Sequence, residues 1–301
     1  MVEMTLSEHL DELRRRLLVS VAAVGLAMFV FLFMKDTVMS VVTRPYRVTW
    51  QKRAAEWYAE TFAKMDPKDL GPYEKERHAF IEEHWEEILD GKEYPGRNVA
   101  RMLEDFGFPL PRRLMSITPL QDIVTYMLAA VLAGLILAAP VVLHQAWSFI
   151  GAGLYRHERR QVMRYLPFSI ALFGGGCAFG YFVMVPYALV FLTGMASPMI
   201  SFNLTVRDYF RFLFALTAAL GFVFQLPVVM LGLVRLRICT PEVYTRYWRH
   251  AILTMFVAGA FLTPPDPVTQ VLMAGPMILL FSLGLMLSKV VYARMERADD
   301  G

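Results

Sequence analysis

The chain has 301 residues, of which 56% are hydrophobic and 19% are charged, and its mean hydropathy is +0.42. A soluble globular domain has about 45–50% apolar residues. The excess here is concentrated in six blocks with almost no internal charge, which is typical of a membrane protein with several spans. The net charge of +3 is small, and the basic residues lie in short segments between the apolar blocks, so nucleic acid is not an expected partner.

The first apolar block begins at Leu17 behind three arginines, and no Ala-x-Ala site follows it. We therefore interpret it as a retained anchor and not as a cleaved signal peptide. The two cysteines, Cys177 and Cys239, have no Cys or His at ligand spacing. They predict neither a disulfide nor a metal site, and we interpret both as packing residues.

Six transmembrane helices are expected from the apolar blocks. The predicted spans are 17–34, 124–143, 166–192, 209–234, 251–262 and 271–287. Crossing a hydrocarbon core of about 30 Å takes about 20 residues. The fifth and sixth spans are therefore expected to be short, and they predict a tight helical hairpin that turns at the double proline Pro264-Pro265.

The arginines and lysines near the spans predict the orientation. They precede span one, lie between spans two and three and between spans four and five, and follow span six, whereas the opposite short loops hold only Arg207. All the basic segments fall on one side of a six-span protein, so both termini are predicted to be cytoplasmic.

The long polar segment 48–113 is expected to be a helical periplasmic insertion. Helices are predicted over 50–65, 72–89 and 98–106, separated by proline- and glycine-containing breaks. We interpret its acidic run, 82–87, as a solvated helix face. The chain is therefore divided into an N-terminal amphipathic helix with the first span (1–47), the insertion (48–113), spans two to six (114–290) and a cytoplasmic tail (291–301).

No catalytic residue, metal site or cofactor is predicted. The sequence has no Gly-x-x-x-x-Gly-Lys-Ser/Thr phosphate loop and no His-Glu-x-x-His zinc motif. No acidic or basic residue lies in the middle of any span, which argues against an ion-coupled transporter without excluding one. A small-solute transporter or channel is the main alternative to a protein that recognises other proteins; an intramembrane enzyme would need a catalytic pair that the spans lack.

Polar groups at the predicted cytoplasmic face remain as candidates. Glu12 lies on a helix with leucines at 6, 10, 13 and 17, and it can pair with Arg16 at i,i+4 spacing. Glu158 stands among four arginines. These acids form local salt bridges in one interpretation; in the other they bind a cationic ligand through bidentate guanidinium contacts.

Two features inside the spans predict helix packing. Gln225, which precedes Pro227, is expected to face another helix or a hydrated groove, because an amide in lipid needs a partner. The spacing of Gly176 and Gly180 in span three favours a close approach of a second helix.

Five segments together resemble the TatC family, the integral receptor subunit of the twin-arginine protein translocase. In family order they are 9–17 (HLDELRRRL), 139–150 (APVVLHQAWSFI), 154–160 (LYRHERR), 224–228 (FQLPV) and 262–266 (LTPPD). The resemblance covers about 7–47 and 114–290, and it does not extend to the insertion.

The resemblance implies a core translocase subunit in the cytoplasmic (inner) membrane that is not an enzyme. It implies binding of Arg-Arg signal peptides of folded proteins at the cytoplasmic face, and nucleation of a translocation complex driven by the proton-motive force. The implied partners are single-span subunits of the TatA/TatB type, the signal peptides, the lipid bilayer and further copies of the chain.

The resemblance also implies site residues. Those associated with signal-peptide binding are Glu12, Arg14, Leu17, Phe149, Leu154, Tyr155 and Glu158. Pro45 and Asp266 match functional motif positions on the periplasmic side. Gln225 matches a polar position of the membrane groove that is often glutamate in the family, and Ala152 stands where the family often has proline.

Overall fold

The computed structural model describes residues 6–66, 68, 70–108, 114–152, 163–194, 204–262 and 267–299. In these residues every regular element is a helix, and one isolated β-bridge joins Met115 to Thr205. The all-α prediction is confirmed for this part of the chain.

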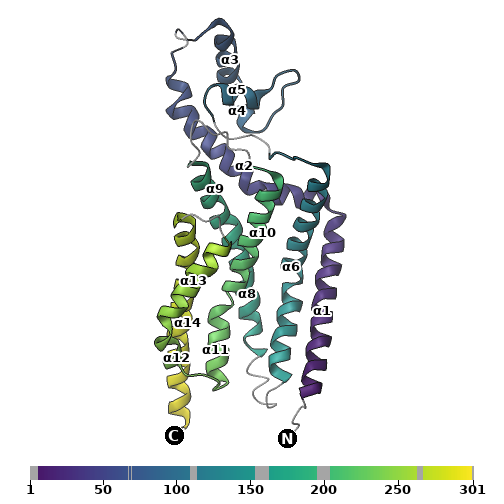
Figure 1. Cartoon of the computed structure of the whole chain (residues 1–301), viewed down its shortest axis with the longest axis vertical. Helices are drawn as coiled ribbons and strands as arrows, with labels where there is room; N and C mark the ends of the chain where they lie inside the picture. Colours follow the sequence, from purple (N-terminus) through teal and green to yellow (C-terminus); the bar gives the residue numbers. More distant parts are fainter. Residues whose placement is uncertain are drawn as a thin grey trace.

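A bundle of long helices forms the larger part of the molecule (Figure 1). It consists of α1 (Leu6–Leu32), α6 (Pro119–Ala152), α8 (Leu166–Phe179), the π-helical turn η3 (Gly180–Met184), α9 (Val185–Gly194), α10 (Val206–Val223), α11 (Leu226–Arg235), α12 (Pro241–Arg246), α13 (Trp248–Leu262) and α14 (Pro267–Asp299). Within the described ranges, five helical stretches are long and apolar enough to cross a membrane: Ser7–Leu32, Leu120–Ala152, Leu166–Leu192, Val206–Arg235 and Thr269–Arg297. The chain is therefore a membrane protein with several spans.

The last two helices differ in length, which corrects one prediction. Helix α13 has 15 residues and is short, as expected, whereas α14 has 33 residues, so the prediction of a short sixth span is wrong. The apolar block ends at 287, but the helix continues through Lys289 and Arg294, because lysine and arginine are good helix formers and do not end a helix. Helix α13 packs along α14, with Gln270 Nε2 donating to the carbonyl of Phe256 (3.1 Å); the double proline between them lies outside the described residues.

The predicted fourth span is divided into α10 and α11. The break falls at Phe224 and Gln225, directly before Pro227. Proline lacks the N–H that would bond to the carbonyl four residues earlier, so the helix reorganises there. This break leaves the Gln225 side chain at a point where the backbone changes direction.

Between α8 and α10 the predicted close packing is confirmed. A Cβ built on Gly176 would lie 2.6 Å from the carbonyl oxygen of Leu220, and one on Gly180 would lie 3.0 Å from the Cα of Thr217. Only glycine permits this approach, and the partner is a helix of the same chain.

The insertion stands at the end of the bundle opposite both termini (Figure 1). Its elements are α2 (Lys35–Glu60), η1 (Phe62–Lys64), α3 (Pro72–Glu83), α4 (Trp85–Leu89) and α5 (Val99–Asp105). Aromatic and aliphatic side chains such as Trp50, Phe62, Trp85 and Phe108 form a core of its own. Helix α2 runs across the predicted boundary at 47/48, so one continuous helix belongs to both the bundle and the insertion.

The acidic run of the insertion is a solvated face, as predicted. Glu82, Glu83 and Glu86 are exposed, while Trp85 between them is buried. Glu87 accepts hydrogen bonds from Lys92 Nζ (2.6 Å) and from the Tyr94 hydroxyl, which lower the pKa of its carboxyl.

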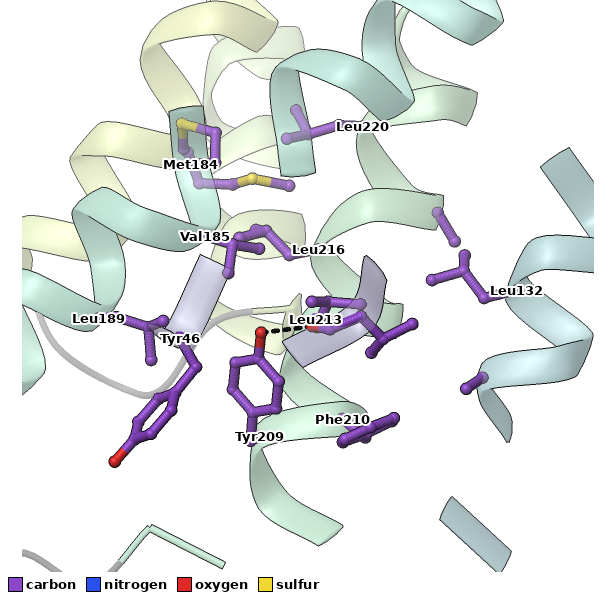
Figure 2. Packing of buried hydrophobic residues seen from close by; sticks show 14 of the residues in the cluster. Tyr46, Leu132, Met184, Val185, Leu189, Tyr209, Phe210, Leu213, Leu216 and Leu220 are labelled. Carbon is purple, nitrogen blue, oxygen red and sulfur yellow. Dashed lines mark hydrogen bonds between the residues drawn. The ribbon is translucent and has the colours of Figure 1, made fainter. Parts of the chain in front are cut away.

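Near α2 lies the main core of the bundle (Figure 2). Side chains from α2, α6, α9 and α10 meet there, including Tyr46, Leu132, Leu189, Tyr209 and Leu213. The core therefore fixes α2 against the spans that carry the rest of the bundle.

Candidate functional site

The N-terminal turns of α1 lie against the last turns of α6. The rings of His9 and Phe149 stack with centroids 4.6 Å apart. Arg16 forms an ion pair with Glu12, and its Nη1 donates to Gln145 Oε1 at 3.2 Å. We call these five residues the α1–α6 junction; it brings the predicted segment 9–17 together with the predicted Phe149.

The ion pair within the junction is largely shielded from solvent. The Glu12 and Arg16 side chains are 21% and 16% exposed. The i,i+4 pairing predicted from the sequence is therefore confirmed. Arg16 binds Glu12 through one oxygen, Oε1, and Oε2 accepts no hydrogen bond from the described residues.

Of the other residues predicted to bind a signal peptide, the structure describes two. Arg14 and Leu17 are exposed on α1, and Leu17 keeps 60% of its surface accessible. Leu154, Tyr155 and Glu158 lie outside the described residues, in the segment that follows the end of α6 at the junction.

Gln225 takes part in a polar network between three spans. Its Nε2 donates to the carbonyl of Ser169 at 3.0 Å, and the indole N–H of Trp147 donates to the Ser169 hydroxyl at 2.7 Å. The prediction that Gln225 faces another helix is confirmed. Trp147 and Ser169 were not predicted as members of this network, although an indole N–H and a hydroxyl inside apolar spans are both expected to find partners.

Pro45 lies inside α2 and is buried against the bundle. It has no N–H to donate to the carbonyl of Val41, four residues earlier, and the hydroxyl of Tyr181 donates to that carbonyl instead. Asp266, the other predicted periplasmic residue, lies outside the described residues.

A second tyrosine, Tyr209, forms a hydrogen bond with the backbone of α2 one residue further along. The Tyr209 hydroxyl donates to the carbonyl of Val42 at 2.7 Å (Figure 2) and is hydrogen-bonded to the backbone of Tyr46. The Tyr46 N–H and the Val42 carbonyl are four residues apart, the spacing of a helical hydrogen bond, so the Tyr209 hydroxyl contacts both groups of one such pair. We call Pro45, Val41, Val42, Tyr181 and Tyr209 the proline corner. The two tyrosines were missed because nothing local in the sequence connects them with Pro45.

The family model described as Sec-independent protein translocase protein (TatC) matches residues 8–276. The chain belongs to the TatC family. All ten residues predicted as site residues fall within the matched range.

Individual TatC proteins agree with this assignment. The chain is 39% identical to TatC of Escherichia coli (strain K12) over 169 residues, which are 56% of this chain and 66% of that protein. It is 31% identical to TatCy of Bacillus subtilis (strain 168) over 175 residues, 58% of this chain and 69% of that protein. The crystal structure of the twin-arginine translocase receptor TatC superimposes with a TM-score of 0.67 at 27% identity, covering 94% of this chain and 99% of that one.

Membership of the TatC family makes the chain a component of the Sec-independent protein translocase and not an enzyme. The junction and the proline corner lie at opposite ends of the bundle, because the first is formed by the start of α1 and the second by α2 (Figure 1). This chain thus has one group of polar contacts at each end of the bundle.

Proposed function

We propose that this TatC protein is the receptor for Arg-Arg signal peptides of folded proteins. The observation that carries the proposal is the α1–α6 junction, where Glu12 and Gln145 together hold the guanidinium group of Arg16. A surface that binds one guanidinium group through a carboxylate oxygen and an amide oxygen has the chemistry to bind another. Oε2 of Glu12, which accepts no hydrogen bond from the described residues, would supply the acceptor for it.

The strength of such a contact depends on its solvation. An exposed ion pair contributes about 0–1 kcal/mol, whereas a hydrogen bond to a charged group in a less solvated place contributes about 1.5–3 kcal/mol. Glu12 is 21% exposed and belongs to the second class. Glu158, in the segment that leaves the junction, would supply the second carboxylate, with Leu154 and Tyr155 beside it.

The apolar part of a signal peptide has a surface available next to these acids. Leu10, Leu13 and Leu17 are 55%, 42% and 60% exposed along α1. Burying such side chains contributes about 25 cal/mol per Å², so the apolar segment would supply most of the affinity. The arginines would supply the discrimination, with Arg14 and Phe149 bordering the same surface.

The remaining parts of the proposal concern topology and assembly. Both termini lie at the same end of the bundle (Figure 1), which agrees with a cytoplasmic location for both in the inner membrane. The insertion, Pro45 and Asp266 would then be periplasmic. The described helices contain no nucleotide-binding loop, so we assign the driving force to the proton-motive force and the passage to single-span TatA/TatB-type partners around several copies of this chain.

Photocrosslinking of an Arg-Arg signal peptide to the full chain in membranes tests the receptor assignment. The substitutions Glu12→Gln and Glu158→Gln keep the side-chain shape and remove both charges. We expect the double variant to lose at least tenfold in crosslinking, because two charged hydrogen bonds are weakened. Glu242→Gln, which removes an exposed charge on α12, is the matched control and should crosslink like the parent. Undiminished crosslinking in the double variant would refute the assignment.

A further inference from the structure

A pocket of about 310 Å³ lies between α2, α6 and α8, in the half of the bundle nearer α2. Small side chains open it: Val41 and Val42 of α2, Ala129 and Ala133 of α6, and Gly174 and Ala178 of α8. Its surface is almost entirely apolar. Because these parts of α6 and α8 belong to membrane-crossing stretches, the pocket faces hydrocarbon and not water.

Two arginines stand at the α2 end of this pocket. Arg44 and Arg47 lie three residues apart on α2, and both are exposed. Neither forms a hydrogen bond or an ion pair with any residue in the described ranges. Both lie close enough to the hydroxyl of Tyr181, a pocket residue, to interact with it electrostatically.

We propose that this pocket binds one acyl chain of an anionic phospholipid, whose phosphate group pairs with Arg44 and Arg47. Guanidinium groups bind phosphate oxygens bidentately. Basic side chains beside an apolar pocket between transmembrane helices suit a lipid that carries both a negative headgroup and an acyl tail. The proline corner joins the apolar pocket to the helix that carries the two arginines. Tyr181 lines the pocket, and its hydroxyl donates to the Val41 carbonyl of α2.

The lining of the pocket favours an acyl chain. The small side chains of Ala129, Ala133 and Gly174 leave room along an irregular apolar surface. A flexible chain of methylene groups can follow such a surface without displacing α6 or α8.

Native mass spectrometry of the purified full chain, with dioleoyl phosphatidylglycerol added, measures the binding directly. We expect one tightly retained lipid, and about twenty-five-fold weaker binding in the double variant Arg44→Gln, Arg47→Gln, since each surface arginine contributes about fivefold to the binding of an anionic lipid. The double variant Arg294→Gln, Arg297→Gln is the matched control, because these exposed arginines have the same spacing and lie on α14, which contributes no residue to this pocket. Equal losses in both double variants would overturn the proposal.

A second pair of variants tests the acyl chain. A Cβ on Gly174 or on Gly175 meets nothing within 4 Å, so a side chain can begin at either position without a backbone clash, but only Gly174 lines the pocket. Gly174→Leu should abolish retention of the lipid and Gly175→Leu should not. Inorganic phosphate and a zwitterionic lipid with the same chains should not compete. Competition by either, unchanged retention in Gly174→Leu, or crosslinking of a single-span subunit at position 174 in place of the lipid would each overturn the proposal. These measurements require no signal peptide and are independent of the proposed function.

Discussion

The Tyr209 hydroxyl is predicted to stabilise α2 only because Pro45 distorts that helix. Tyr209 is fully buried and its hydroxyl bridges the Val42 carbonyl and the backbone of Tyr46. In Tyr209→Phe the aromatic ring stays, but both backbone groups lose the hydroxyl. We expect the Pro45 ring, which crowds the preceding turn, to hold this part of α2 wide enough that the two groups cannot pair directly with each other.

The expected loss of stability in Tyr209→Phe follows from two ranges of free energy. A buried polar group left unsatisfied costs about 1–3 kcal/mol, whereas hydrogen bonds between membrane helices average about 0.6 and reach about 1.7 kcal/mol. Two groups are affected here, so we expect Tyr209→Phe to lower the free energy of unfolding by about 1–2 kcal/mol. In a Pro45→Ala background the helix can close, and the same substitution should cost less than about 0.5 kcal/mol.

Unfolding of the purified chain in mixed micelles, by a denaturing detergent, gives the four free energies of this double-mutant cycle. Tyr187→Phe is the matched control: Tyr187 is 64% exposed and its hydroxyl has no hydrogen-bond partner among the described residues, so it should change little. An equal cost of Tyr209→Phe with and without Pro45 would show that the proline does not create the need for the tyrosine.

Two further predictions concern helix packing and the insertion. Gly176→Ala should destabilise the bundle by about 1–3 kcal/mol, because the added Cβ would meet the Leu220 carbonyl, which belongs to the backbone and cannot move aside. Gly175→Ala, which places its Cβ in open space, should be close to neutral. The same unfolding by a denaturing detergent measures both variants. Hydrogen bonds hold the pKa of Glu87 below its ordinary value of 4.5, so their stabilisation is complete above about pH 5 and is lost as the pH falls through the folded pKa. Limited proteolysis of the insertion between pH 6 and pH 3 should therefore show a pH dependence that Glu87→Gln reduces and Glu104→Gln leaves unchanged.

The sequence predicted the features whose cause is local. The Glu12–Arg16 pair follows from i,i+4 spacing, and the close approach of a helix at Gly176 follows from the absence of a side chain. In the insertion, the start of α3 at Pro72 and the gap before α5 follow from the proline and glycine breaks, whereas the start of α2 at Lys35 and the break between α3 and α4 at His84 were not predicted. The wrong length of the sixth span had a local cause as well: the apolar block ends near Leu287, but α14 continues to Asp299.

The features that could not be predicted join residues far apart in the chain. Arg16 and Gln145 are 129 positions apart, and Tyr209 and Val42 are 167 apart. Each partner alone looks ordinary: a glutamine near a helix end, or a tyrosine at the start of a span. Pro45 could have predicted the acceptor of one of these hydrogen bonds, because a proline inside a helix leaves a carbonyl four residues earlier that some donor must satisfy. Which tyrosine supplies that donor depends on how α8, η3 and α10 pack, and only the fold decides this.

Gln225 shows how one substitution changes the chemistry of a whole position. Its Nε2 donates to the carbonyl of Ser169, whereas a glutamate, frequent at this position in TatC proteins by the resemblance noted above, is an acceptor when ionised and can donate only when protonated. An amide therefore makes permanently the bond that a glutamate would make only after taking up a proton. Since an amide does not titrate, position 225 of this chain cannot bind or release a proton, and a proton-dependent step in transport by this chain must involve another group.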